Sequence, residues 1–272
     1  MMKLPRLKTL LLIPVFLFFL IYIFGVITVM QDDRKVTPLD KELVYPKNIA
    51  IFGASGTAGD GILKAAMASS DIKKIHIITR RVTARMEQGV KLGKAEVTIH
   101  KDYLDYQPII DKLVKVDAVY WAIGINSIGV DEKTYAMIHV DFPMRFTEAW
   151  LKSSQKESLS FHYISSSDIS DDSTVMWARE KRRAEKSLFA FAEETKMQVI
   201  AYRPDYIGAT EEEAHLGQYM LYYFFAPIGA AVKAEQIGQA MLEVTARENE
   251  FSNGDKLHTS KIIRYSNAYE MR

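Results

Sequence analysis

The sequence predicts an α/β protein with a doubly wound parallel sheet and one N-terminal transmembrane helix. Three observations predict this organisation. Short apolar runs alternate with segments of helical composition from residue 48 onward, a glycine-rich turn joins the first run to the first helical segment, and residues 10–30 carry no charged side chain. Alternating strands and helices form βαβ units, which fold into a sheet with helices on both faces.

The predicted strands are short, apolar and partly β-branched, and turn-forming or polar residues bound them. They cover residues 48–53, 75–80, 95–100, 117–124, 160–166 and 198–204. Helices are predicted at residues 57–69, 107–115, 133–152, 174–195 and 233–247. Because helix-length segments separate the strands, right-handed crossovers make the sheet parallel.

The composition excludes several classes of function. The chain has 272 residues, a net charge of +1 and basic residues spread along its length, so it lacks the positive surface that a nucleic-acid-binding protein needs. It contains no cysteine, which excludes disulfides, thiolate nucleophiles and cysteine metal sites. Its six histidines lack the paired spacing that binds zinc, and we predict no metal site.

Residues 10–30 form a predicted single-pass membrane anchor. As a helix this stretch would be about 31 Å long, which matches the thickness of a bilayer core. The alternative is a cleaved signal peptide, but the apolar run is longer than such peptides use and no small-residue cleavage motif precedes Gln31. A basic N-terminus, residues 1–9, precedes the anchor, and a polar tether, residues 31–47, follows it.

The charges that flank the anchor do not fix its orientation. Lysine and arginine favour the cytoplasmic side of a membrane. Their numbers on the two sides are nearly balanced, with Lys3, Arg6 and Lys8 before the anchor and Arg34, Lys35, Lys41 and Lys47 after it.

The stretch GASGTAG, residues 53–59, predicts a dinucleotide-binding turn. Its glycines, Gly53, Gly56 and Gly59, fall where the first strand passes into the first helix. Glycine at these positions allows a tight turn, a close approach of the backbone to a pyrophosphate, and close packing of the helix on the sheet. The phosphates then lie at the positive N-terminus of the helix.

Two arginines at the end of the second strand favour NADP(H) over NAD(H). An NAD site normally carries an acidic residue about 20 residues after the glycines. Here Arg80 and Arg81 supply positive charge where a 2′-phosphate would lie, unless they are solvated surface charges. Asp102, just after the third strand, would contact the adenine or cap a turn.

Several motifs in order along the chain resemble one large family. The glycine turn, VYWAIG at 119–124, YISSS at 163–167, Lys181 and YRPDYIG at 202–208 resemble the atypical short-chain dehydrogenases/reductases, which are NAD(P)-binding Rossmann proteins. Within that group the chain is most similar to small members like the human Tat-interacting tumour suppressor and its fungal mitochondrial relatives. The resemblance covers residues 48 to about 250 and implies a cofactor across the carboxyl ends of the strands.

The resemblance also implies a relay of serine, tyrosine and lysine. The serine maps to Ser165 or Ser166 and the lysine to Lys181, but the tyrosine, expected four residues before the lysine, maps to Trp177. An indole N–H donates a hydrogen bond and does not ionise near neutral pH, so it cannot replace a phenol as acid and base. The predicted cofactor contacts are Gly53, Ser55, Gly56, Thr57, Ala58, Gly59, Arg80, Arg81, Asp102, Ala122, Gly124, Lys181 and Pro204.

Lys181 lies on the apolar stripe of its predicted helix. Residues 177, 181, 184, 188, 191 and 195 alternate spacings of four and three, which places them on one face. An unpaired ammonium there would be costly, so the ribose of a dinucleotide would serve as its partner. The alternative is a lysine that snorkels to water. The other basic residues of the segment, Arg179, Arg182, Arg183 and Lys186, are expected to form a solvated face.

The domain at 48–272 is expected to end in a small substrate or lid region from about residue 206. Its aromatic stretch, residues 215–229, would line a substrate pocket, touch the membrane beside the anchor, or join the core, and core is the usual fate of such a stretch. Tyr163, Tyr206 and Asp168 are positional candidates for a substitute acid, although each is expected to pack or cap.

The sequence therefore predicts a membrane-anchored NADP(H)-binding protein with an oxidoreductase-type site and an altered acid. The alternatives are a non-catalytic NADP-dependent protein that binds a protein partner, and a sugar-nucleotide epimerase or dehydratase. The supply of NADP favours the cytoplasmic face for the domain, and the alternative is a lumenal domain that uses a local NADPH pool. The small-molecule substrate is not readable from the sequence.

Overall fold

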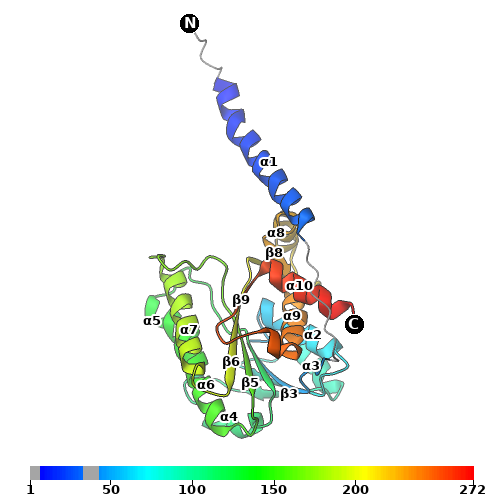
Figure 1. Cartoon of the computed structure of the whole chain (residues 1–272), viewed down its shortest axis with the longest axis vertical. Helices are drawn as coiled ribbons and strands as arrows, with labels where there is room; N and C mark the ends of the chain where they lie inside the picture. The colour runs from blue at the N-terminus through cyan, green and yellow to red at the C-terminus, as the bar shows by residue number, and fades with distance from the viewer. Residues whose placement is uncertain (1–6, 33–42) are drawn as a thin grey trace.

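The structure, a computed structural model, describes residues 7–32 and 43–272. The basic residues Lys3 and Arg6, and most of the expected tether, lie outside the described residues. Helix α1(Leu7–Gln31) contains a stretch, Leu12–Gln31, that is long and apolar enough to cross a membrane. The helix projects away from the folded domain (Figure 1).

The main sheet of the described chain has seven parallel strands in the order β3-β2-β1-β4-β5-β6-β9. Their bounds are β1(Asn48–Phe52), β2(Lys74–Thr79), β3(Ala95–Ile99), β4(Ala118–Trp121), β5(Leu159–Ile164), β6(Met197–Arg203) and β9(Lys256–His258). The strand order reverses beside β1, which confirms the predicted doubly wound sheet.

Helices cover both faces of this sheet (Figure 1). The α-helices after α1 are α2(Thr57–Ala68), α3(Ala84–Lys91), α4(Gln107–Ile110), α5(Glu132–Ala136), α6(Phe142–Ser153), α7(Met176–Ala192), α8(Leu216–Phe225), α9(Ala234–Ala246) and α10(Thr259–Glu270). Shorter turns are the 3-10 helices η1(Asp111–Leu113), η3(Ala226–Ile228) and η4(Glu248–Glu250), and the π-helical turn η2(Met137–Asp141) between α5 and α6.

The alternation of side chains along each strand divides the core into two apolar clusters. Ile49 and Ile51 of β1 pack toward α2, α9 and α10, whereas Ala50 and Phe52 pack toward α4, α6 and α7. Both faces of β1 are therefore buried, as its continuous apolar sequence requires.

Several elements were not predicted from the sequence. These are α3, α10, strand β9, and a small two-stranded sheet of β7(Tyr206–Gly208) and β8(Ala231–Lys233). The three strands have three residues each, too few to show a period of two. Because α9, β9 and α10 join the main core, the region that stands apart from it is residues 206–230.

Of the three fates considered for residues 215–229, the commonest one, joining the core, is wrong. They form α8 and η3, in which no side chain is buried. Figure 1 places α8 at the base of α1, above the end of the domain where β8 lies. Among its aromatic residues, Phe224 contacts Phe18 and Tyr22 of α1, while Phe225 packs on Tyr206 of β7.

Candidate active site

The turn between β1 and α2 has no room for side chains at two of its glycines. Gly53 has φ +80°, and a Cβ there would lie 2.6 Å from the carbonyl carbon of Ala122. A Cβ on Gly59 would lie 2.1 Å from the oxygen of Gly53. These two glycines therefore let α2 start directly against the carboxyl ends of β1 and β4.

Gly56 differs from the other two glycines. It has extended backbone angles that any residue adopts, and a Cβ there would meet only the Gly53 oxygen, at 3.5 Å. The fold does not need glycine at this position. An exposed backbone at the N-terminus of α2, with nothing above it, fits the phosphates of a dinucleotide.

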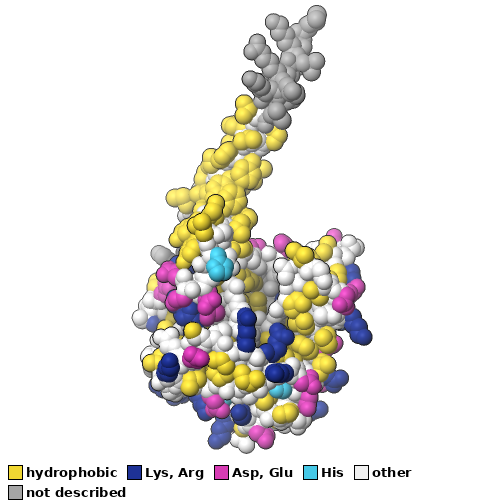
Figure 2. Space-filling model, turned by 180° about the vertical axis from the view of Figure 1, so that it is seen from behind, with side chains coloured by type: hydrophobic (Ala, Val, Ile, Leu, Met, Phe, Trp, Pro, Cys, Tyr) yellow, Lys and Arg dark blue, Asp and Glu magenta, His cyan; other side chains and the backbone are white. Residues whose placement is uncertain are grey.

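A cavity of about 450 Å³ lies beside this turn, at the carboxyl edge of the sheet. Its lining includes seven of the predicted cofactor contacts: Gly53, Ser55, Gly56, Arg80, Arg81, Ala122 and Gly124. No acidic residue lines it. A second cavity of about 380 Å³ shares Ser55, Gly56 and Arg81 and adds Thr57 and residues of the segment before α8. Figure 2 shows the surface hollowed below the base of α1, with Lys and Arg side chains at the lower edge of the hollow.

The two arginines after β2 are both exposed at the rim of this cavity. The Nη2 of Arg81 donates to the oxygen of Ser55 at 3.3 Å, which brings the guanidinium over the glycine turn. The hydroxyl of Thr79 donates to the oxygen of Arg81 at 2.7 Å and fixes the backbone. This arrangement fits an anionic group bound between the turn and the arginines.

The remaining predicted cofactor contacts lie elsewhere. Asp102 is exposed and accepts from the backbone N–H of Leu104 at 3.0 Å, which is the turn-capping role. Pro204 is buried after β6, where its oxygen accepts from the N–H of Ser167. Ala58 and Gly59 belong to the first turn of α2 and line neither of the two cavities.

Lys181 is buried, with 7 % of its surface exposed. Its ammonium donates to the oxygen of Ile164 at 3.0 Å and lies 5.2 Å from the ring centroid of Tyr163. The alternative of a lysine that snorkels to water is therefore wrong. Burial lowers the pKa of Lys181 from 10.5 to about 8, although Glu185 opposes this shift.

An ion pair fixes α7, the helix that carries Lys181. The Nε of Arg203, at the end of β6, donates to Glu185 at 2.9 Å, and both side chains are buried. Of the other charged residues of α7, Arg183 and Lys186 are exposed, as expected, whereas Glu180 is buried and pairs with Arg183. Arg179 pairs with Glu132, and Arg182 donates to the oxygen of Ser170.

Ser165 follows β5 and has a buried hydroxyl that bonds to no other described residue. Its backbone N–H donates to the oxygen of Tyr202 at 2.7 Å, so the position of the serine is fixed by the sheet. Ser165 is adjacent in the chain to Ile164, which accepts from Lys181. The structure thus brings the serine and the lysine together, while Ser166 is half-buried.

Trp177 lies in the first turn of α7, one turn before Lys181, and is half-buried. The candidate substitute acids are placed unfavourably. Tyr163 is fully buried, donates to the oxygen of His139 at 3.2 Å, and has a pKa raised well above 10 by burial. Tyr206 donates to the oxygen of Gln218, and Asp168 is exposed.

Sequence reasoning missed His139, which lies in the π-helical turn η2. Its Nε2 accepts from the N–H of Ile125 at 3.3 Å, and its Nδ1 is buried without a partner among the described residues. Burial and the nearby Lys181 lower its pKa to about 2, so the imidazole is neutral. Such turns mark functional sites, but a single inserted residue leaves no signal in hydrophobic periodicity.

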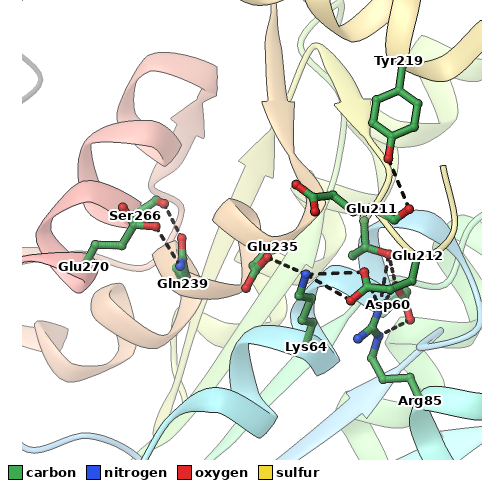
Figure 3. Close-up of polar contacts among 11 residues, drawn as sticks. Asp60, Lys64, Arg85, Glu211, Glu212, Tyr219, Glu235, Gln239, Ser266 and Glu270 are labelled. Carbon is green, nitrogen blue, oxygen red and sulfur yellow. Dashed lines mark hydrogen bonds and ion pairs between the residues drawn. The ribbon is translucent and has the colours of Figure 1, made fainter. Parts of the chain in front are cut away.

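A polar network behind the glycine turn fixes the segment that leads to α8 (Figure 3). Asp60, in the first turns of α2, accepts from Arg85 at 2.7 Å and from the hydroxyl of Thr210 at 2.6 Å. Glu212 binds both Arg85 and Lys64. The second cavity is therefore closed on one side by residues whose positions depend on α2.

Solved structures of short-chain dehydrogenases/reductases have the same fold. A 3-oxoacyl-acyl-carrier-protein reductase from Brucella melitensis, in complex with NAD, is 16% identical over 80% of this chain and 97% of that chain, with a TM-score of 0.59. The NADPH-dependent 3-quinuclidinone reductase from Rhodotorula rubra is 13% identical over 84% and 97%, with a TM-score of 0.59. A short-chain dehydrogenase/reductase from Saccharomyces cerevisiae is 14% identical over 78% and 96%, again with a TM-score of 0.59.

No protein-family profile and no curated protein sequence matches the chain. The likeness is therefore one of fold. From β1 to α10 the chain has the architecture of the short-chain dehydrogenases/reductases.

The glycines of the turn give a paired prediction. Gly59→Ala should destabilise the fold by about 3 kcal/mol, because its Cβ meets backbone that cannot move. Gly56→Ala should change stability by less than about 0.5 kcal/mol and still weaken dinucleotide binding. Thermal unfolding and cofactor titration of both variants check this. A Gly56→Ala variant that binds like the unaltered chain would contradict the assignment of the turn.

The pKa of Lys181 predicts a pH-dependent stability. The protonated lysine destabilises the folded state below pH 8, and this cost disappears as the pH rises from about 8 toward 10.5. The Lys181→Met variant should therefore be more stable than the unaltered chain by about 2 kcal/mol near neutral pH. This figure already subtracts the one hydrogen bond that the variant loses. Unfolding at about pH 7 and about pH 9.5 should show the difference shrinking. Substitution of the exposed Lys186 by Met is the control. A stability difference between Lys181→Met and the unaltered chain that does not change with pH would refute the lowered pKa of Lys181.

Proposed function

We propose that the chain is a membrane-anchored NADP(H)-binding protein of the atypical short-chain dehydrogenase/reductase type, with an oxidoreductase site in which Trp177 replaces the usual tyrosine. The observation that carries this proposal is the buried hydroxyl of Ser165, which has no partner in the described part of the chain and lies beside the buried ammonium of Lys181. A buried hydroxyl without a partner costs about 1–3 kcal/mol. A substrate oxygen bound there would remove that cost.

The preference for NADP(H) rests on the charges around the 450 Å³ cavity. Arg80 and Arg81 supply two cations at its rim, and none of its lining residues is a carboxylate that could accept from ribose hydroxyls. A 2′-phosphate would pair with these guanidinium groups, which bind phosphate in a fixed bidentate geometry.

The site residues have separate parts in the proposed chemistry. NADPH, when bound, supplies the hydride for a carbonyl carbon. The Ser165 hydroxyl donates to the carbonyl oxygen, and the Trp177 indole shapes the pocket and donates without ionising. Lys181, with a pKa of about 8, is the group beside Ser165 that releases a proton near neutral pH.

The anchor in this proposal is α1, whose apolar stretch has the length of a bilayer core. The domain then lies on the cytoplasmic face, where NADP(H) is supplied. The resemblance to the small members like the Tat-interacting tumour suppressor concerns the folded domain alone, because the anchor lies outside it.

A second candidate function is a non-catalytic NADP-dependent protein that binds a protein partner. The observation that favours it is the placement of Tyr163, whose hydroxyl already donates to His139 and whose pKa is raised. In this version the site retains the cofactor contacts and lacks the acid. Bound cofactor would then order residues 206–230 and a surface for the partner.

Titration with the two dinucleotides tests the cofactor assignment. NADP should bind at least about tenfold more tightly than NAD, and Arg80→Gln with Arg81→Gln should remove most of that difference. Arg145→Gln on α6, an exposed arginine that does not line the cavity, is the control. Equal affinities for the two dinucleotides would refute the role of the arginines. A chain that binds neither dinucleotide would refute the proposed cofactor site.

Restoring the phenol tests the altered site. Trp177→Tyr should raise the rate of NADPH oxidation with a panel of ketones by about 10²–10⁴-fold, the usual contribution of a positioned acid. Turnover that is equally fast in the unaltered chain would show that Trp177 does not limit catalysis. Cofactor binding with no turnover in either form would select the non-catalytic candidate.

A further inference from the structure

Helix α8 and turn η3 present an apolar surface that the domain leaves uncovered. Residues 216–232 contain no charged side chain. The exposed fractions of Leu216, Met220 and Tyr223 are 78 %, 66 % and 68 %. Their spacings of four and three place them on one face of the helix. A water-soluble domain seldom leaves such a face exposed without a function.

The same helix lies against the anchor. The hydroxyl of Tyr22 in α1 donates to the oxygen of Phe224 at 2.9 Å. The ring of Phe224 stacks on that of Phe18, with centroids 6.2 Å apart. A Cβ added to Gly25 of α1 would lie 3.2 Å from Ile228 of η3, so the two backbones approach closely. Figure 2 shows hydrophobic side chains continuing from α1 onto the surface at its base.

These contacts fall within the apolar stretch of α1 and not at its end. The stretch is Leu12–Gln31, and Tyr22 lies about 13 Å along the helix axis from Gln31. Half the thickness of a bilayer core is about 15 Å. A bilayer that surrounds α1 up to Gln31 therefore also reaches α8.

Two backbone carbonyl groups at the end of α8 have hydrogen-bond donors within the protein, as a helix end without access to water requires. At the end of α8 the Phe224 oxygen accepts from Tyr22, and the Phe225 oxygen accepts from the N–H of Ala230. Helix ends in lipid need such partners, because an unpaired carbonyl costs several kcal/mol there. Exposed charges occur just outside the segment, at Glu211 to Glu213 before it and at Lys233 after it.

We propose that α8 and η3 are embedded in the bilayer leaflet on the domain's side, with the face of Leu216, Met220 and Tyr223 against lipid acyl chains. The inference rests on the proposed anchoring by α1. It adds a second membrane contact, which holds the domain at a fixed distance from the bilayer. His215 and Gln218 begin this segment and also line the 380 Å³ cavity, so the cavity lies beside the membrane surface.

The absence of cysteine allows a direct test in the full-length chain. Single substitutions Met220→Cys and Tyr223→Cys report on α8, Phe19→Cys on the anchor, and the exposed Lys186→Cys on α7 of the domain. Each variant carries a nitroxide label in phosphatidylcholine vesicles. Electron paramagnetic resonance then compares its collisions with oxygen, which dissolves in lipid, and with a water-soluble nickel chelate.

Labels at 220 and 223 should match the lipid-like accessibility at 19 and differ from the aqueous label at 186. Aqueous labels at 220 and 223 together with a lipid-like label at 19 would overturn this inference and leave the anchor intact. An aqueous label at 19 would overturn the anchor itself, and the inference with it. The accessibility of the labels does not depend on cofactor affinity or turnover. Failure of the proposed chemistry is therefore distinguishable from failure of the membrane contact.

Discussion

The first turn of α2 packs against the end of β1 at a distance that leaves no space for a Cβ on Gly59. This approach sets the position of α2 relative to the sheet, and the cavity beside the turn depends on it. Asp60, the next residue, then binds Arg85 and Thr210 and so fixes the segment before α8. One steric constraint at the glycine turn therefore determines both walls of the proposed cofactor site.

The other half of the site depends on buried charges carried by α7. Glu185 and Arg203 neutralise each other, which keeps the helix fixed to β6. Lys181, four residues earlier, has only a neutral carbonyl acceptor within hydrogen-bond distance among its described contacts, and its pKa falls accordingly. Removing one member of a buried ion pair destabilises the fold, because the other charge is left without a partner. A buried ammonium can instead lose its proton when the pH is near its pKa. The same helix thus combines a buried ion pair with a buried lysine whose pKa is lowered.

The proposed membrane segments and the proposed site meet in residues 206–230. This region starts at the carboxyl end of β6, lines the second cavity, and ends against α1. Movement of the domain relative to the anchor would therefore act on the cavity through α8. The network of Asp60, Arg85 and Glu212 is the connection between them (Figure 3).

The sequence by itself determined the doubly wound sheet, the glycine turn, the apolar anchor stretch and the burial of Lys181, because each follows from local periodicity or spacing. It could not determine which face of α8 meets a neighbour, since a helix without charged residues has no strongly polar side to orient it. The tertiary structure decided that α8 lies against α1, that the Tyr163 hydroxyl donates to the backbone oxygen of His139, and that the Ser165 hydroxyl has no hydrogen-bond partner among the described residues. These outcomes depend on contacts between residues far apart in the chain, which local patterns do not encode.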